Sequence, residues 1–442
     1  MITVVGTGTG APVPDDVLAG AALVVGGRRH LDAVRPPAGA ERVVLGPLVP
    51  ALDTIAAYVG KELPVLVLAS GDPGFFGIVR ALAERFGAGL LDVRPAVSSV
   101  AAAFARVGLP WDDAVVVSAH GRKLRTAVNV CRARPKVAVL TGPGAGPAEL
   151  ATALLHGSGA PGGPAAGPEP VAAPASAGPG AASAQAARGR VLVVASALGS
   201  EDERVERVTP AEAVTRDWGS DVSVVLCLDE TRALGGVRTV AAAPTGPAGW
   251  ALDEGAFAHR DSMITKFEIR ALALARLGPR LGDLVWDVGA GSGSVAVECA
   301  RLGAAVVAVE KAADGVERIR ANARAHGVDV DVVHGAAPEA LAGLADDPDA
   351  VFVGGGGREL PSVVTACARR ARRTVVVAVA ALDRVPAARE ALLAAGFTCD
   401  GVLLQSSRLS PLPGDVTRLA ATNPVFLLWG VRPPASSEGV VQ

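Results

Sequence analysis

The stretch Asp287-Val288-Gly289-Ala290-Gly291-Ser292-Gly293 lies between an apolar run and a segment with helical periodicity. The run Leu284–Val288 predicts a buried strand, and Val295–Leu302 after the glycines predicts a helix. Glycines in such a turn let the backbone approach a ligand closely, and the first N–H groups of the helix are free to bind it. The sequence therefore predicts a strand–turn–helix unit with a binding loop.

An acidic residue at the end of the next predicted strand extends this pattern. Glu310 ends the run Ala305–Glu310 and follows Gly289 by about 20 residues, the spacing at which a carboxylate binds both ribose hydroxyls. A nicotinamide-binding loop would have glycine where this chain has Ser294. The loop, the preceding Asp287 and Glu310 together predict an adenosyl cofactor, foremost S-adenosylmethionine. A turn that binds no cofactor and a nicotinamide-dependent oxidoreductase are the alternatives.

The segments around this unit continue the same alternation of strands and helices. The sequence predicts helices at Lys266–Leu277 and at about 315–325, and strands at Val330–Val333, Ala350–Val353 and Thr374–Val379. The last two runs, Phe397–Leu404 and Pro424–Trp429, are expected to form an antiparallel pair at one edge of the sheet.

The first half of the chain also has an α/β pattern. Short runs rich in β-branched residues predict strands at Ile2–Val5, Leu23–Val25, Val43–Leu45, Val65–Leu68, Val115–Val117, Val137–Leu140, Val191–Ala195 and Val222–Leu228. Two of them are followed by further glycine loops, Gly6–Gly10 and Ser70–Gly77. Open α/β sheets bind ligands at the carboxyl ends of their strands, so these loops are candidates for a second site.

Composition divides the chain into units. Residues 157–187 are almost entirely Gly, Pro, Ala and Ser, with Glu169 as the single charge, which predicts a disordered insertion. Residues 235–249 form a similar connector. We therefore expect a first domain at 1–234, a linker at 235–249, a second domain at 250–432 and a tail at 433–442.

Charge and hydropathy exclude several classes of protein. A net charge of −2 over 442 residues argues against a nucleic-acid binder. The mean hydropathy is +0.38, but the run Val375–Leu382 is far shorter than the about 20 residues of a spanning helix. Five widely spaced cysteines without a C-x-x-C pair predict a reduced, cytoplasmic protein with no metal site. We attribute the apolar half of the composition to two buried sheets of parallel type.

Taken together, the motifs resemble two known groups of enzymes. Gly6–Gly10, Ser70–Gly77, Ser98-Ser99, Ser118–Arg122 and Leu140–Pro143 resemble the tetrapyrrole (class III) methylases of corrin synthesis. Ile264–Lys266, Asp287–Gly293, Val351–Gly357 and Asn423–Gly430 resemble their class I partner, which methylates and decarboxylates. Fused in this order, they resemble the precorrin-6Y C(5,15)-methyltransferases (decarboxylating) of the cobalamin pathway.

The resemblance implies a fold and an activity. It implies a bilobed tetrapyrrole-methylase domain followed by a Rossmann-like class I methyltransferase domain, with one S-adenosylmethionine site in each. It further implies methylation of precorrin-6B, or its cobalt form, at meso carbons 5 and 15, with decarboxylation of the ring C acetate. The implied partner is a polycarboxylate tetrapyrrole, with no nucleic acid and no membrane, and the chain is expected to form a homo-oligomer.

The resemblance also assigns site residues. The cofactor contacts of the first half are Gly6, Gly8, Gly10, Gly71, Asp72, Pro73, Ser98, Ser99, Thr141 and Gly142. Those of the second half are Thr265, Gly289, Ala290, Gly291, Ser292, Gly293, Glu310, Ala336 and Ala337. Ala96 and Ala336 stand where the family tends to have a glycine and an acid. They leave open the alternative that one half is only a scaffold or sensor that binds S-adenosylmethionine.

Substrate carboxylates require cationic partners. Arg122 and Arg358 are the predicted substrate contacts, and Lys123 and Arg125 are further candidates. For Arg122, Lys123 and Arg125 a solvated run of charges is the alternative. The candidate catalytic residues are His120, Lys266 and Glu268. The alternative for His120 is a structural histidine, and the alternative for Lys266 and Glu268 is an ordinary ion pair.

Overall fold

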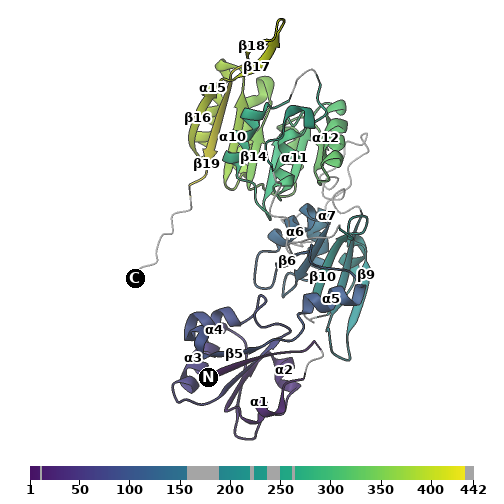
Figure 1. The fold of residues 1–442 in the computed structure, drawn as a ribbon, viewed down its shortest axis with the longest axis vertical. Helices are drawn as coiled ribbons and strands as arrows, with labels where there is room; N and C mark the ends of the chain where they lie inside the picture. Colours follow the sequence, from purple (N-terminus) through teal and green to yellow (C-terminus); the bar gives the residue numbers. More distant parts are fainter. Residues whose placement is uncertain (10–11, 157–188, 220–222, 236–248, 261–263, 434–442) are drawn as a thin grey trace, which may run out of the picture.

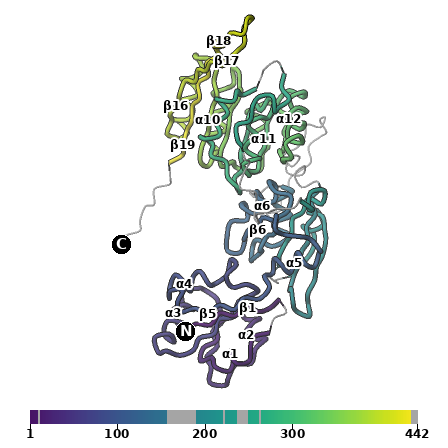
Figure 2. Tube along the Cα trace, viewed as in Figure 1, coloured from purple at the N-terminus to yellow at the C-terminus, as the bar shows by residue number. Residues whose placement is uncertain are grey.

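The computed structural model describes residues 1–9, 12–156, 189–219, 223–235, 249–260 and 264–433. Three α/β units follow one another along an elongated molecule, and the chain passes through them in sequence order (Figures 1 and 2). Three sheets of five, five and seven strands form their centres, and a separate two-stranded sheet lies near the C-terminal end. Of the expected segments, Gly10, the insertion 157–187, almost all of the linker 235–249 and almost all of the tail 433–442 lie outside the described residues.

The first unit, lobe 1, is a parallel sheet in the order β3-β2-β4-β1-β5. Its strands are β1 (Ile2–Thr7), β2 (Leu23–Gly26), β3 (Glu41–Val44), β4 (Val65–Ser70) and β5 (Leu91–Arg94). Its helices are α1 (Asp15–Ala19), α2 (Arg28–Asp32), α3 (Leu48–Val59) and α4 (Val79–Phe86). Because all five strands are parallel, the glycine loops after β1 and β4 meet at one edge of the sheet.

The second unit, lobe 2, has the strand order β6-β7-β10-β8-β9. Its strands are β6 (Val115–Ser118), β7 (Lys136–Leu140), β8 (Arg190–Ser196), β9 (Arg204–Val208) and β10 (Ser223–Asp229). Its helices are α5 (Ser99–Val107), α6 (Leu124–Ala133), α7 (Pro147–His156) and α9 (Pro210–Thr215). The predicted bilobed first half is therefore confirmed.

The expectation of parallel sheets is wrong for lobe 2. Only β6 and β7 pair in parallel, and β10 runs antiparallel to both β7 and β8. Helix α5 covers one face of the sheet, and α6, α7 and α9 cover the other. Strands buried on both faces read as continuous apolar runs whatever their direction, so the sequence pattern did not reveal the pairing.

The third unit, the class I unit, has the strand order β13-β12-β11-β14-β15-β19-β16. Its strands are β11 (Leu284–Val288), β12 (Ala305–Glu310), β13 (Asp331–His334), β14 (Ala350–Val353), β15 (Thr374–Val379), β16 (Thr398–Leu404) and β19 (Val425–Val431). The main helices are α10 (Phe267–Leu277), α11 (Ser294–Arg301), α12 (Ala313–Ala325), α14 (Leu360–Arg370) and α15 (Val385–Ala394), with the short α13 (Glu339–Ala342). The antiparallel pair expected at one edge is confirmed as β16 and β19. The hairpin of β17 (Ser407–Leu412) and β18 (Val416–Ala421) was not predicted.

Buried polar contacts join lobe 2 to the class I unit. Arg132 of α6 donates to the carboxylate of Asp346 at 3.0 Å, and both side chains are 7% exposed. Arg125 binds both carboxylate oxygens of Asp349, at 3.1 and 2.8 Å. This pairing places Arg125 in the junction, so it is corrected from a candidate substrate contact to a structural residue. Breaking a buried pair by removing one partner typically costs about 3–5 kcal/mol.

Across the described residues, no helix combines the length and apolar character needed to span a bilayer.

Candidate functional site

The glycine loop of the class I unit is held by a buried carboxylate. Asp287 ends β11 and is 2% exposed, and its Oδ2 accepts the N–H of Ala296 in the first turn of α11 at 2.9 Å. It therefore satisfies one of the free donors at the start of that helix. Gly291 has φ +59°, and no other group lies within 4 Å of the position that a Cβ would occupy. The loop thus presents bare backbone in front of α11.

Glu310 connects this loop to the adjacent strand. Its Oε2 accepts the N–H of Gly291 at 2.8 Å, and its Oε1 accepts the N–H of Ala312 at 2.9 Å. Each carboxylate oxygen can accept more than one hydrogen bond. The side chain is therefore fixed by the backbone and keeps acceptor capacity for a ligand.

A cavity of about 350 Å³ opens beside this carboxylate. Its lining includes the predicted residues Gly289, Glu310, Ala336 and Ala337. The remaining lining residues, which were not predicted as contacts, are Val288, Val309, Lys311, Gly335, Gly355, Gly356, Glu359 and Val363. Ala290, Gly291, Ser292 and Gly293 form the turn next to the cavity, and the carbonyl of Ser292 accepts a hydrogen bond from Asn322 at 2.8 Å.

Burial raises the pKa of Asp287 to about 7, and the nearby carboxylate of Glu310 adds to the rise. The folded chain therefore holds a proton between about pH 4 and 7 that the unfolded chain has lost, so the free energy of unfolding falls as pH rises through this window. Asp287→Asn keeps an oxygen for Ala296 but does not titrate. We expect its stability relative to the parent to rise by about 3 kcal/mol between about pH 5 and about pH 8, measured by denaturant unfolding.

The exposed Asp383 of the same unit supplies the matched control. Asp383→Asn should leave the relative stability unchanged over the same pH range. An equal change in both variants would contradict the assignment of the titration to Asp287.

The other candidates of the class I unit lie outside the lining of this cavity. Thr265 and Lys266 precede α10 and are half-buried. Glu268 accepts two hydrogen bonds from Arg408 of β17, at 2.9 and 2.6 Å, and this pairing lowers its pKa. The ion-pair alternative therefore describes Glu268 in this structure. Arg358 is exposed beside Glu359, which lines the cavity.

In lobe 1, the predicted glycines bring three chain segments into contact. A Cβ on Gly6 would collide with the carbonyl oxygen of Gly71 and would lie 2.5 Å from the N of Ala96. A Cβ on Gly71 would lie 3.0 Å from the carbonyl oxygen of Val97. The loops after β1, β4 and β5 therefore pack backbone against backbone at the carboxyl edge of the sheet.

Polar side chains in these loops serve local structure first. Asp72 accepts the N–H of Gly74 at 2.8 Å, which shapes the turn that contains Pro73. Ser98 caps α5 by accepting the N–H of Ala101 at 3.1 Å, and Ser99 begins that helix. Because the side chains of Asp72 and Ser98 are already hydrogen-bonded within the protein, we expect the backbone groups of these turns to be the main cofactor contacts.

The candidates of lobe 2 lie after β6 and β7. The hydroxyl and the N–H of Thr141 both donate to the carbonyl of Ser223, at 2.6 and 3.2 Å, and the residue is 3% exposed, so little of it is open to a ligand. His120 is exposed and packs over Gly142, with its Nδ1 3.3 Å from the Thr141 carbonyl. The Arg122 guanidinium lies 5.9 Å from the ring centroid of Phe76 in lobe 1. Arg122 therefore faces the glycine loops across the two lobes.

Two residues at the same edge of lobe 1, Arg29 and His30, were not predicted, and both contact Ser70 of the predicted loop Ser70–Gly77. The hydroxyl of Ser70 lies 2.6 Å from Nη2 of Arg29 and 2.8 Å from Nε2 of His30. Burial, with a smaller effect of Arg29, lowers the pKa of His30 to about 4, so the ring is neutral near pH 7. The signal available in the sequence was Arg28-Arg29-His30, two glycines after the predicted strand Leu23–Val25, at the carboxyl end of a third parallel strand.

Comparisons with known proteins match both halves. The family model for tetrapyrrole (corrin/porphyrin) methylases covers residues 1–214, and the model for the precorrin methyltransferase domain covers 255–431. The precorrin-6Y C(5,15)-methyltransferase (decarboxylating) of a Sinorhizobium species is 37% identical over 347 residues, 78% of this chain and 74% of the relative. The chain belongs to the precorrin-6Y C(5,15)-methyltransferase (decarboxylating) family. The resemblance inferred from its motifs is thereby confirmed.

Two shorter relatives are matched over nearly their whole length. The cobalt-precorrin-7 C(5)-methyltransferase of Salmonella typhimurium is 30% identical over 236 residues, 52% of this chain and 100% of the relative. A probable cobalt-precorrin-6B C(15)-methyltransferase (decarboxylating) of Pyrobaculum calidifontis is 38% identical over 171 residues, 37% of this chain and 87% of the relative. Membership of the precorrin-6Y C(5,15)-methyltransferase family makes the chain a methyltransferase, and the nicotinamide-dependent alternative has no support.

Proposed function

We propose that the chain methylates precorrin-6B, or its cobalt form, at meso carbons 5 and 15 and decarboxylates the ring C acetate. Lobes 1 and 2 would methylate carbon 5, and the class I unit would carry out the other two reactions. The observation that carries this proposal is the presence of two separate glycine-loop sites, each at the carboxyl edge of its own parallel strands. Relatives named for each activity alone, matched over 236 and 171 residues, support the division.

The class I cavity has the features that S-adenosylmethionine requires. Bare backbone at Gly291 admits close approach of a ligand, whereas Gly289 packs against the backbone of Gly355, and Glu310 would bind the ribose hydroxyls. The chain at Ala336 and Ala337 lines the cavity, and its backbone groups would contact the adenine. S-adenosylmethionine supplies a methyl group on a sulfonium that leaves readily, so the residues of the chain mainly bind and orient.

In the first half, the loops at Gly6, Gly8, Gly71 and Asp72 would hold the second cofactor molecule, and Gly142 of lobe 2 would add a contact. Arg122 and Arg358 would pair with carboxylates of the tetrapyrrole at their respective sites, since guanidinium groups match carboxylates in charge and shape. Exclusion of water around the ring C acetate would favour its decarboxylation, because the carboxylate loses its hydration. The conjugated macrocycle would accept the electron pair that the carboxylate leaves behind.

Equilibrium titration with radiolabelled S-adenosylmethionine tests the number of sites. Two molecules per chain support the proposal, and one would contradict it. A half that binds S-adenosylmethionine only as a scaffold or sensor would also give two, so the product must separate that alternative. Incubation of the full chain with precorrin-6B and cofactor should then yield a product in which two methyl groups have replaced two hydrogens, a net gain of two CH2 units, with the loss of one carbon dioxide. A product that carries a single methyl group would contradict the assignment of both methylations to this chain.

Self-association into a homo-oligomer stays a prediction. The β17–β18 hairpin favours it, because the cross-strand partners Leu409 and Leu419 are 79% and 67% exposed. Equilibrium sedimentation should reveal a species heavier than the 44.2 kDa monomer, and Leu409→Asp should reduce it.

A further inference from the structure

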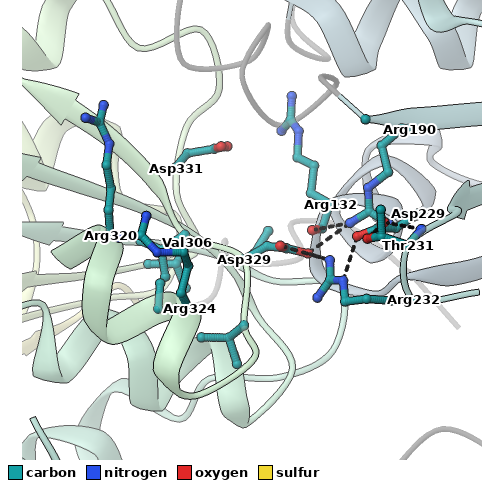
Figure 3. Close-up of a pocket in the computed structure, with 15 residues that line it drawn as sticks. Arg132, Arg190, Asp229, Thr231, Arg232, Val306, Arg320, Arg324, Asp329 and Asp331 are labelled. Carbon is teal, nitrogen blue, oxygen red and sulfur yellow. Dashed lines mark hydrogen bonds and ion pairs between the residues drawn. The ribbon is translucent and has the colours of Figure 1, made fainter. Parts of the chain in front are cut away.

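A second cavity, here named the boundary cavity, lies between lobe 2 and the class I unit and has a volume of about 410 Å³. Figure 3 shows Arg132, Arg190 and Arg232 on the side of lobe 2, and Arg320 and Arg324 of α12 on the opposite side. Asp329 lies between the two groups (Figure 3). Both halves of the chain therefore contribute cationic side chains to one cavity.

The boundary cavity is distinct from both glycine-loop sites. In the class I unit it is lined by Ala305 and Val306, where β12 begins, and by Asp331, where β13 begins. The glycine cavity lies at the opposite, carboxyl ends of the same strands. In lobe 2 the boundary cavity adjoins Asp229, at the end of β10. The candidate cofactor contact Thr141, which follows β7, lies at the opposite end of β10, where it binds Ser223.

Positive charge exceeds negative charge in the lining, which holds five arginines and three aspartates, Asp229, Asp329 and Asp331. Asp329 accepts hydrogen bonds from Arg190 at 3.0 Å and from Arg232 at 2.7 Å. Within the described part of the chain, Arg324 has no ion pair or side-chain hydrogen bond. Arg320 binds Glu317 at 2.7 Å, so the positive charge left for a ligand on the α12 side is that of Arg324.

Buried donors on both walls also lack acceptors. Arg132 is 8% exposed, and its Nε has no hydrogen-bond partner among the described residues, although the rest of its guanidinium binds Asp346 and the carbonyl of Ala153. The Nε of Arg320 is likewise buried and has no partner among those residues. A buried donor without an acceptor is unfavourable, so an added acceptor in the cavity would be stabilising.

We propose that the boundary cavity binds a small multivalent oxyanion through arginines of both halves and thereby links them. Guanidinium groups bind carboxylate and phosphate oxygens bidentately, so both a polycarboxylate and a polyphosphate fit this chemistry. The volume lies near the lower end of the range for small-molecule sites. This proposal is independent of the assignment of the two methylations.

Calorimetric titration of the full chain with pyrophosphate and with citrate, at matched ionic strength in chloride, tests the proposal. We expect saturable binding of one ion per chain, weakened by about tenfold or more in Arg324→Ala and in Arg320→Ala. Preference for pyrophosphate would assign a phosphate ligand, and preference for citrate a carboxylate ligand. Arg132 is left unchanged because its pair with Asp346 joins the halves.

Two further variants make the test specific. Arg318 lies on the same helix, binds Asp314 at 2.9 Å and does not line the cavity, so Arg318→Ala should bind the ion as the parent does. Burial raises the pKa of Asp331 to about 7, so Asp331→Asn removes a negative charge from the lining at about pH 8 and should tighten binding there. Absence of saturable binding, or equal losses in Arg318→Ala and Arg324→Ala, would overturn the proposal.

Discussion

Replacing Glu310 with alanine is expected to remove methylation at carbon 15 and decarboxylation while methylation at carbon 5 continues. The carboxylate holds the N–H groups of Gly291 and Ala312 and is the proposed ribose ligand. Hydrogen bonds to a charged group contribute about 1.5–3 kcal/mol each. Loss of the two proposed bonds to the ribose hydroxyls therefore predicts at least about a 100-fold weaker affinity for S-adenosylmethionine at this site. Mass spectrometry of the tetrapyrrole product and cofactor titration measure both effects.

Glu359→Ala is the matched control, because Glu359 lines the same cavity but is exposed and contacts Ser362 of its own helix turn. It should retain both activities of the class I unit within a few-fold. If Glu310→Ala lowered the two methylations equally, the separation of activities between the halves would be wrong.

Replacing Gly6 with alanine is expected to have the opposite effect, with loss of methylation at carbon 5. The added Cβ would collide with the Gly71 carbonyl and lie 2.5 Å from the N of Ala96, and neither backbone group can rotate away. The loops after β1 and β4 must then move apart, and a displacement of about 1 Å can cost about 100-fold in rate. Product mass and single-turnover rates of each methylation measure the result.

Gly39→Ala adds the same methyl group to the same lobe where nothing lies within 4 Å. It should leave both methylations unchanged, and circular dichroism should show that Gly6→Ala retains its secondary structure. Normal methylation at carbon 5 in Gly6→Ala would rule out these loops as the cofactor site. Asp72→Ala, which removes the hydrogen bond to Gly74, is expected to impair the same reaction more mildly.

The sequence predicted the parts of the fold that depend on local pattern. The run Leu284–Val288, the glycine loop and the strand ending at Glu310 were found at their expected places, because buried parallel strands and glycine turns have strong local signals. The β17–β18 hairpin was missed because its exposed strands lack a continuous apolar run. In lobe 2, helices on both faces conceal the direction of the strands.

The sequence by itself determined the family, the two α/β halves and the glycine loops, since these follow from residue types at fixed spacing along the chain. Only the tertiary structure decided which side chains meet. It assigned Arg125 to Asp349, Glu268 to Arg408 and the hydroxyl of Thr141 to Ser223, and it gathered arginines from both halves around the boundary cavity. Such pairs join residues far apart in the chain, and their partners are set by how the units pack, which no local pattern encodes.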